Sequence, residues 1–339
     1  MKKILTTMCA VAMLAGCTGN TKKASESAAS TAEEASSLKV GVGSVTSVEN
    51  TPKEGEDTTA EFDTTVASVV LEGDVIKAVY FDVAQDKAKY DAMGHVTSDN
   101  TSAMTKKELG DDYGMKKASK IGKEWYEQIE ALENWATGKT VDEVLGMKTN
   151  EKGGTEDEDL MTGCTIGVGS FQKALEKAAN NAVEAKDVAS VGTSVVTTFN
   201  NKDASADKSG QIQANTTYGV VAVDKDGKVV LTLTDVAQNA VKFTATGALD
   251  GEAEAVPTKF EKKDDYGMKK ASKIGKEWYE QNQAFDDWTV GKTADEVSGM
   301  KVNDKGSTAD EDLMTGCTIG VTGLQKVVVA AINSAKAVK

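Results

Sequence analysis

The sequence contains no arginine, and its 339 residues include only one histidine, two prolines and four cysteines. Without arginine there is no planar guanidinium group to clamp a carboxylate or a phosphate through two parallel hydrogen bonds. All positive side chains are therefore lysines, and 39 of them against 53 acidic residues leave a net charge of −14. Because nucleic-acid binding needs dense positive charge against the phosphates, this composition argues against a nucleic-acid partner.

The single histidine, His95, makes histidine-centred catalysis a poor explanation for this chain. A Ser-His-Asp or Cys-His arrangement needs an imidazole beside each nucleophile. We interpret His95 as a surface residue. Aromatic residues make up 5% of the chain, which suggests small cores rather than one large one.

The N-terminus has the order of parts of an export signal. Two lysines precede an apolar stretch of 12 residues, 4–15, which is too short to span a bilayer and suits a signal peptide. The following segment, LAGC at 14–17, resembles the bacterial lipobox, in which the cysteine is acylated and becomes the mature N-terminus. We therefore predict a signal peptide at 1–16, lipidation at Cys17, and anchoring by several acyl chains.

Residues 17–38 contain almost no large apolar side chain, so we predict a flexible tether there. After it the chain repeats itself. Residues 111–168 align without a gap on 264–321, and 45 of the 58 positions are identical. The repeat predicts two domains, at 39–185 and 186–339. Its period is far too long for a solenoid.

Each copy runs from strands to helices. We predict strands at 64–71 and 75–82 in the first copy, and at 218–223 and 229–233 in the second. An amphipathic helix is expected at 115–135, a short helix at 140–145, a polar loop at 148–158, and a turn with a short strand at 162–168. A last helix near 171–183 would be capped by Ser170, as its counterpart would be by Thr322. Each copy is thus expected to be an α+β unit with a mainly antiparallel sheet.

All four tryptophans, at 125, 135, 278 and 288, fall within the repeat. Their helical spacing favours core packing over stacking on an aromatic cofactor.

Two cysteines remain as ordinary thiols, Cys164 and Cys317. A redox role for Cys164 is disfavoured because the surrounding acids would raise the pKa of its thiol. A disulfide between the two would require the equivalent sites of both copies to face each other.

The last identical block holds the segment DLMTGCT, at 159–165 and again at 312–318. In it a carboxylate, Asp159, stands six residues before a hydroxyl, Thr165. A glycine and a small residue come immediately before that hydroxyl, and glycine lets the chain turn sharply and lets a bulky partner approach the backbone. The threonine could be presented to another enzyme as an acceptor, and the flanking acids could help to place a metal-bound substrate there.

This pattern resembles the flavinylation motif of the FMN-binding domain family, Asp-x-x-Ser/Thr-Gly-Ala-Ser/Thr. The resemblance implies that a magnesium-dependent flavin transferase takes FMN from FAD and joins its phosphate to the last hydroxyl of the motif. Cysteine stands where the family usually has alanine. The residues that the resemblance assigns to covalent FMN, up to two per chain, are Thr165, Asp159, Thr162 and Gly163 in the first copy and Thr318, Asp312, Thr315 and Gly316 in the second.

The chain as a whole resembles the flavinylated extracellular electron-transfer lipoproteins of Gram-positive bacteria. That resemblance implies an electron carrier, anchored by lipid to the outer face of the cell membrane. Electrons would come from a membrane NADH dehydrogenase or a quinol-linked donor and pass to extracellular acceptors. We expect no catalytic residues and no resident metal. A covalent link also suits a chain without arginine, because it removes the need for a guanidinium clamp on the FMN phosphate.

Two other interpretations stay open. In the first, the protein is a flavin-free surface lipoprotein whose duplicated domain binds a ligand or a protein partner. The motif would then be a polar turn in which Thr165 hydrogen-bonds locally. In the second, the protein is a secreted hydrolase. That is weaker, since no histidine is repeated and the paired carboxylates at 157 and 159 are more simply a solvated loop.

Overall fold

The structure is a computed structural model and describes residues 37–99 and 104–338. The predicted signal peptide, Cys17 and nearly all of the predicted tether lie outside the described residues. Both copies of the repeat belong to one compact unit. The first strand starts at Leu38, the last residue of the predicted tether.

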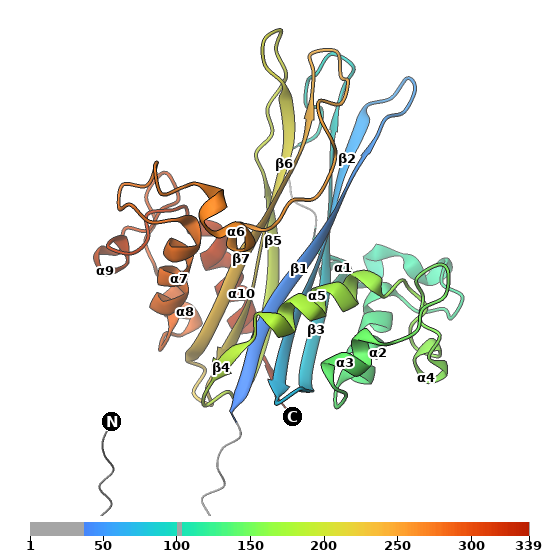
Figure 1. Cartoon of the computed structure of the whole chain (residues 1–339), viewed down its shortest axis with the longest axis vertical. Coiled ribbons are helices and arrows are strands. Elements are labelled where there is room, and N and C mark those ends of the chain that lie inside the picture. Colours follow the sequence, from blue (N-terminus) through green and yellow to red (C-terminus); the bar gives the residue numbers. More distant parts are fainter. Residues whose placement is uncertain (1–36, 100–103, 339) are drawn as a thin grey trace, which may run out of the picture. The chain divides into compact units, whose positions relative to one another are not determined.

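The first copy builds a four-stranded sheet and then its helices (Figure 1). The strands follow one another as a meander, and a short C-terminal strand returns beside the first, giving the order β3-β2-β1-β4. Its elements are β1 (Leu38–Thr51), β2 (Thr58–Glu72), β3 (Val75–Tyr90), α1 (Lys106–Leu109), η1 (Gly110–Tyr113), η2 (Met115–Lys117), α2 (Trp125–Ala136), α3 (Val141–Leu145), α4 (Glu158–Met161), α5 (Gly169–Asn180) and β4 (Val183–Ala185).

The second copy repeats this plan with the strand order β7-β6-β5-β8. All strand pairs within the two sheets are antiparallel, so the expected α+β class with mainly antiparallel sheets is confirmed. Its elements are β5 (Ser190–Phe199), β6 (Gly210–Val223), β7 (Val229–Phe243), α6 (Lys259–Lys262), η3 (Lys263–Tyr266), α7 (Trp278–Thr289), α8 (Ala294–Ser298), α9 (Glu311–Met314), α10 (Thr322–Asn333) and β8 (Lys336–Ala337).

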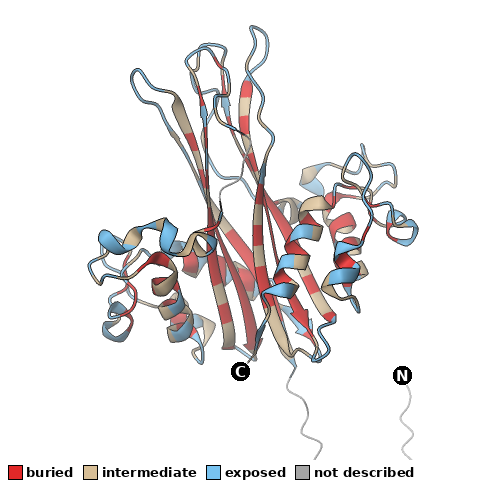
Figure 2. Cartoon of the chain, turned by 180° about the vertical axis from the view of Figure 1, so that it is seen from behind, coloured by how far each residue is buried: buried red, intermediate tan, exposed pale blue. Residues whose placement is uncertain are grey.

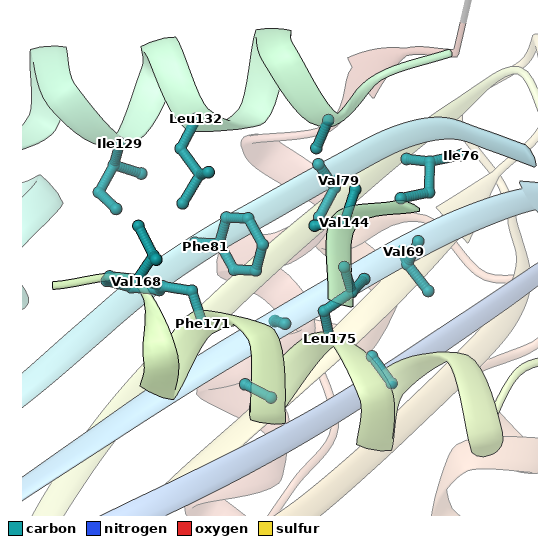
Figure 3. Packing of buried hydrophobic residues seen from close by; sticks show 14 of the residues in the cluster. Val69, Ile76, Val79, Phe81, Ile129, Leu132, Val144, Val168, Phe171 and Leu175 are labelled. Carbon is teal, nitrogen blue, oxygen red and sulfur yellow. The ribbon is translucent and has the colours of Figure 1, made fainter. Parts of the chain in front are cut away.

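Helices α2 and α5 cover one face of the first sheet. Phe81 of β3 lies among Leu132 of α2 and Phe171 and Leu175 of α5 (Figure 3). The rings of Phe81 and Phe171 meet edge to face, with their centres 5.3 Å apart. An equivalent core lies between the second sheet and its own helices.

Glycine permits the closest of these helix contacts. A Cβ atom added to Gly41 of β1 would lie 2.0 Å from the carbonyl oxygen of Ala178 in α5. At the matching place in the second copy, Gly192 of β5 would bring a Cβ within 1.8 Å of the Ala331 carbonyl oxygen. No side chain fits there, so the last helix of each copy rests directly on a strand backbone.

The other faces of the two sheets pack against each other. Val66 and Val70 of the first sheet share a core with Val220 and Ala222 of the second. Further along the strands, the rings of Tyr90 and Phe243 stack with their centres 4.0 Å apart. Residues 64–71 of β2 and 216–223 of β6 are therefore buried on both faces, and the central strands carry red runs in Figure 2.

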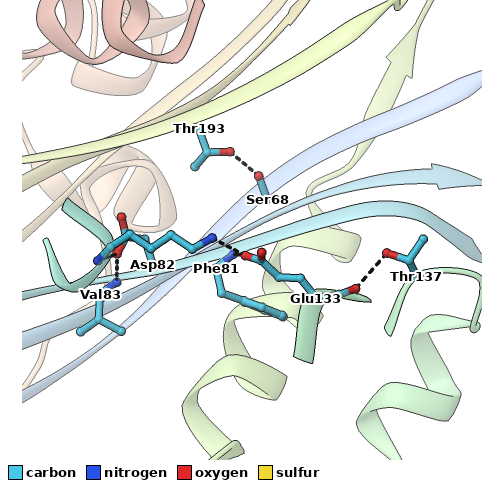
Figure 4. A network of polar contacts seen from close by, with 8 residues as sticks. Ser68, Phe81, Asp82, Val83, Glu133, Thr137 and Thr193 are labelled. Carbon is cyan, nitrogen blue, oxygen red and sulfur yellow. Dashed lines mark hydrogen bonds and ion pairs between the residues drawn. The ribbon is translucent and has the colours of Figure 1, made fainter. Parts of the chain in front are cut away.

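The two copies also meet through polar contacts. The hydroxyls of Ser68 and Thr193 form a short hydrogen bond between the sheets (Figure 4). An ion pair joins Lys177 Nζ to Glu261 Oε1 at 2.6 Å. The predicted halves thus share buried side chains and hydrogen bonds, so neither sheet could be separated without exposing an apolar face.

The predicted helix at 115–135 is too long at its N-terminal end. Helix α2 begins only at Trp125. The carboxylate of Glu124 accepts hydrogen bonds from the backbone N–H groups of Met115 at 2.8 Å and Lys116 at 3.1 Å. Gly114 and Gly122 have φ angles of 74° and 64°, values that the αR region does not include. Residues 115–124 therefore form the short 3-10 helix η2 followed by a loop, and the start of this segment is tied to the start of α2.

The predicted caps at Ser170 and Thr322 are wrong. Helix α5 begins at Gly169 and α10 at Thr322, and neither start has a side-chain cap. The chain enters each helix through a backbone bridge instead, Gly154 to Gly167 and Ser307 to Gly320. Those bridges also replace the short strand predicted at 162–168. Helix α5 ends at Asn180 rather than near 183, because residues 183–185 pair with β1.

The predictions that the tryptophans pack in the cores and that His95 lies at the surface are confirmed. Trp125 and Trp278 are buried in the two helix-covered cores, and Trp135 and Trp288 pack against them. His95 is exposed, with its Nδ1 3.2 Å from Asp91 Oδ2. No helix in residues 37–99 or 104–338 is long and apolar enough to cross a bilayer.

Candidate functional site

The segment DLMTGCT, which is identical in the two copies, lies in a single helical turn and the loop that follows it. Asp157 caps the turn α4 by accepting a hydrogen bond from the N–H of Leu160 at 2.9 Å. Thr162 ends it, and its hydroxyl donates to the carbonyl oxygen of Asp159 at 2.8 Å. The second copy repeats both contacts, at 3.0 Å and 2.8 Å. The two segments therefore share one geometry as well as one sequence.

The glycine of the motif is required by packing. A Cβ atom on Gly163 would lie 2.7 Å from Cβ of Ala131 in α2, and one on Gly316 would lie 2.9 Å from Cβ of Ala284 in α7. Both distances are too short for real carbon atoms. The sequence suggested that this glycine admits an external partner, but the close neighbour is a helix of the same copy.

Each candidate acceptor threonine is held by one buried glutamine. The N–H of Thr165 donates to Gln128 Oε1 at 2.9 Å, and its hydroxyl donates to the same oxygen at 3.2 Å. Thr318 makes the same two bonds to Gln281, at 2.9 Å and 3.0 Å. Thr165 is exposed and Thr318 half-buried. The buried glutamine therefore orients the hydroxyl from the protein interior, while the threonine itself remains at least partly exposed.

The glutamine is itself fixed on both sides. Gln128 Nε2 donates to Ser119 Oγ and to the carbonyl oxygen of Lys123, both at 3.2 Å. Gln281 does the same with Ser272 at 3.1 Å and Lys276 at 3.0 Å. Sequence reasoning missed these glutamines. Their only signal was the block WYEQ, identical in both copies.

The first acceptor opens into a cavity of about 430 Å³ with lysines on its wall. Lys120 and Lys152 line it together with Thr165. The second copy has the same residue types at the aligned positions, Lys273 and Lys305. An ammonium group neutralises phosphate as a point charge, so this wall suits a phosphate bound at Thr165. The donor set therefore fits a phosphodiester without arginine.

The acidic residues of the motif lie at the surface. Asp159 and Asp312 are exposed on their helical turns, and Asp159 is not among the residues that line the 430 Å³ cavity. No group of three or more histidine, cysteine or acidic side chains within the described ranges is close enough to hold a metal ion. The acids are left facing solvent.

The cysteines beside the acceptors are buried free thiols. Burial is the main cause that raises the pKa of Cys164 to about 11, and the nearby Lys123 opposes it. Burial likewise raises the pKa of Cys317 to about 11. From the sequence we predicted that neighbouring acids raise the pKa of the Cys164 thiol. The predicted direction is right, but the principal cause is burial. Neither thiol has the depressed pKa of a reactive cysteine.

Comparison with known proteins identifies no family for this chain. No family model matches it, and no solved structure matches it. A chlorophenol reductase from Desulfitobacterium hafniense is 58% identical over 40 residues. That stretch covers 12% of this chain and 12% of the reductase, so the chain is similar to only a small part of that protein.

Proposed function

We propose that this protein is a membrane-anchored extracellular electron carrier with FMN covalently attached to Thr165 and Thr318. In each copy, a buried glutamine holds the hydroxyl of a threonine that is not itself buried, and this is the main support for the proposal. A hydroxyl presented in the same way twice, within a segment that resembles a flavinylation motif, is what a modifying enzyme would need at its acceptor.

Attachment uses FAD as the co-reactant and a separate flavin transferase as the catalyst. The threonine oxygen forms a bond to the FMN phosphorus of FAD, and the bond between that phosphorus and the bridging oxygen of the pyrophosphate breaks. AMP leaves and the hydroxyl proton is released. Each site gains the mass of FMN less water. The exposed acids of the motif, Asp159 and Asp312, would meet the transferase and its magnesium ion.

The chain's own residues hold and orient the attached group. Gln128 keeps the Thr165 backbone in place, and Lys120 and Lys152 offset the phosphate charge in the cavity. Bound FMN supplies the redox chemistry, while the protein sets attachment, orientation and electrostatics. Electrons would arrive from a membrane NADH dehydrogenase or a quinol-linked donor and leave to extracellular acceptors.

The arrangement of the copies bears on how electrons would move. The turns α4 and α9, which precede the two acceptors, lie on opposite sides of the paired sheets (Figure 1). Both sheets and parts of both helical layers stand between them. We therefore expect each flavin to exchange electrons with other molecules rather than with its counterpart in the same chain.

The test is intact-mass spectrometry of the protein co-expressed with a flavin transferase. Two additions of FMN less water are expected, one lost in Thr165→Ala and the other in Thr318→Ala. Thr137→Ala, at an exposed threonine outside the motif, is the matched control and should keep both. No addition, with a transferase shown to be active on a control substrate, would overturn the proposal and favour the flavin-free binding protein.

A further inference from the structure

A second cavity adjoins the acceptor cavity of the first copy. It has a volume of about 530 Å³. The two cavities share the side chains of Met115 and Ile166, and Ile166 directly follows Thr165. A group attached to Thr165 by a flexible arm would therefore meet this second cavity next.

One wall of the second cavity is aromatic. Tyr113, Trp125 and Phe171 line it. The ring of Trp125 lies 6.4 Å from that of Tyr113 and 6.2 Å from that of Phe171, measured between centres. Lys106 also lines the cavity, with its Nζ 5.3 Å from the centre of the Tyr113 ring. Such a wall suits a flat heteroaromatic ring.

The same cavity contains a carboxylate with unused hydrogen-bonding capacity. Asp63 lines it, and its Oδ1 is buried without a hydrogen-bond partner among the described residues. Its Oδ2 accepts one long bond from Gln85 at 3.4 Å. A buried acceptor that is left unpaired is costly and calls for an explanation. A ligand N–H group placed against Oδ1 would supply the missing donor.

The second copy does not repeat this feature. Asp63 faces Gln85 across the strands, and the residue that faces Gln238 in the second sheet is Asn215. Asn215 Oδ1 already accepts bonds from Gln238 at 2.8 Å and from Gln213 at 3.1 Å. Tyr266, the counterpart of Tyr113, donates to Gln238 Oε1 at 3.4 Å. Here the polar groups satisfy one another.

We propose that Asp63 positions the flavin ring in the first copy by accepting a hydrogen bond from the imide N–H of its pyrimidine edge. Lys106 would lie where it can donate to a neighbouring ring carbonyl, and the half-buried ring of Tyr113, backed by the buried rings of Trp125 and Phe171, would cover a ring face. This proposal rests on the proposed attachment at Thr165. It makes the two flavins unequal, because a carboxylate beside the ring opposes the negative charge gained on reduction. The flavin of the first copy should have the lower reduction potential.

The experiment compares Asp63→Asn with Asn215→Asp in flavin-loaded protein. A background of Thr318→Ala leaves only the first flavin, and Thr165→Ala leaves only the second. Asparagine is tolerated at the matching position of the second sheet, so Asp63→Asn should fold, and circular dichroism checks this. Midpoint potentials are measured by spectroelectrochemistry near neutral pH.

Asp63→Asn should shift the equilibrium of the first flavin about tenfold towards the reduced form, or about 30 mV for a two-electron couple. Asn215→Asp should lower the potential of the second flavin. Loaded protein whose first potential does not change with Asp63→Asn would overturn this inference alone. Absence of the FMN mass would overturn the proposed function, and this inference with it.

Discussion

The two copies build nearly identical acceptor sites, yet their central helices meet the sheets through different chemistry. In the first copy Lys107 Nζ of α1 and Glu133 Oε1 of α2 form an ion pair at 2.5 Å. In the second copy the aligned residues are Phe260 and Asp286, and Asp286 is in none of the ion pairs formed within residues 37–99 and 104–338. Its carboxylate instead accepts hydrogen bonds from the hydroxyl and the N–H of Thr234, at 2.6 Å and 3.0 Å.

Both arrangements give the buried polar groups partners, the first through an ion pair and the second through hydrogen bonds. Burial lowers the pKa of Lys107 and raises that of Glu133, and their attraction opposes both shifts. Burial raises the pKa of Asp286 well above its ordinary value. The first interface therefore depends on a pair of charges and the second on hydrogen bonds alone. Identical motifs can thus rest on interfaces that respond differently to mutation and pH.

The largest expected effect comes from Glu133→Ala. It leaves Lys107 without its counter-charge and Phe81 N–H without the acceptor that it reaches at 2.6 Å. Removing one partner of a buried ion pair costs about 3–5 kcal/mol. Asp286→Ala leaves two neutral donors, the N–H and the hydroxyl of Thr234, without their acceptor. It should therefore cost about 1–3 kcal/mol. Urea denaturation of both variants measures the difference, and equal losses of unfolding free energy would show that the two interfaces do not differ in this way.

A pH dependence should follow from Asp82 in β3. Burial raises the pKa of Asp82 to about 6, despite hydrogen bonds that oppose the shift. The folded protein therefore keeps this proton to higher pH than the unfolded chain. The resulting stabilisation is complete below about pH 4 and is lost as the pH rises to about 6, by about 3 kcal/mol. In Asp82→Asn this part of the slope of unfolding free energy against pH should vanish. An unchanged slope would contradict the assignment.

The glutamines that hold the two threonines should behave alike, because their contacts match in the two copies. Gln128→Ala and Gln281→Ala each leave a threonine N–H without its acceptor, so each should cost about 1–3 kcal/mol. Because the contacts match, the two losses should be equal within about 0.5 kcal/mol. Thermal unfolding measures them, and mass spectrometry of the same variants should show less flavin at the altered site only. A large inequality would mean that the two sites differ in a way that these contacts do not capture.

The smallest effect is expected for Asp286→Asn. The amide oxygen can accept from Thr234 N–H while the amide nitrogen donates to the Thr234 hydroxyl, so no buried group is left unpaired. The change in unfolding free energy near neutral pH should be within about 1 kcal/mol of zero. Glu133→Gln in the first copy should cost more, because it leaves the charge of Lys107 unbalanced. The two are best compared by urea titration at one pH.

Much of each copy could be predicted from local pattern. The hairpins around residues 73 and 227 follow from their turn residues, and the glycines there have φ angles of 64° and 76°. The short helix at 141–145 begins at Thr140 with a capping box, as its sequence indicates. The strands β1 and β5 were missed. Glycines weaken a strand pattern, and Gly41 in β1 and Gly192 in β5 are the positions that let α5 and α10 rest on these strands.

The duplication, the alternation of strand and helix signals, and the placement of one threonine at the end of each motif are local or repeated patterns, so they can be recognised in the sequence. The contact between Gln128 and Thr165, which are 37 residues apart, arises only from folding. Folding also determines that the two sheets pack face to face and that Asp63 lies in a cavity beside the acceptor. Those outcomes depend on which buried faces and polar groups meet, and packing settles this over the whole chain at once.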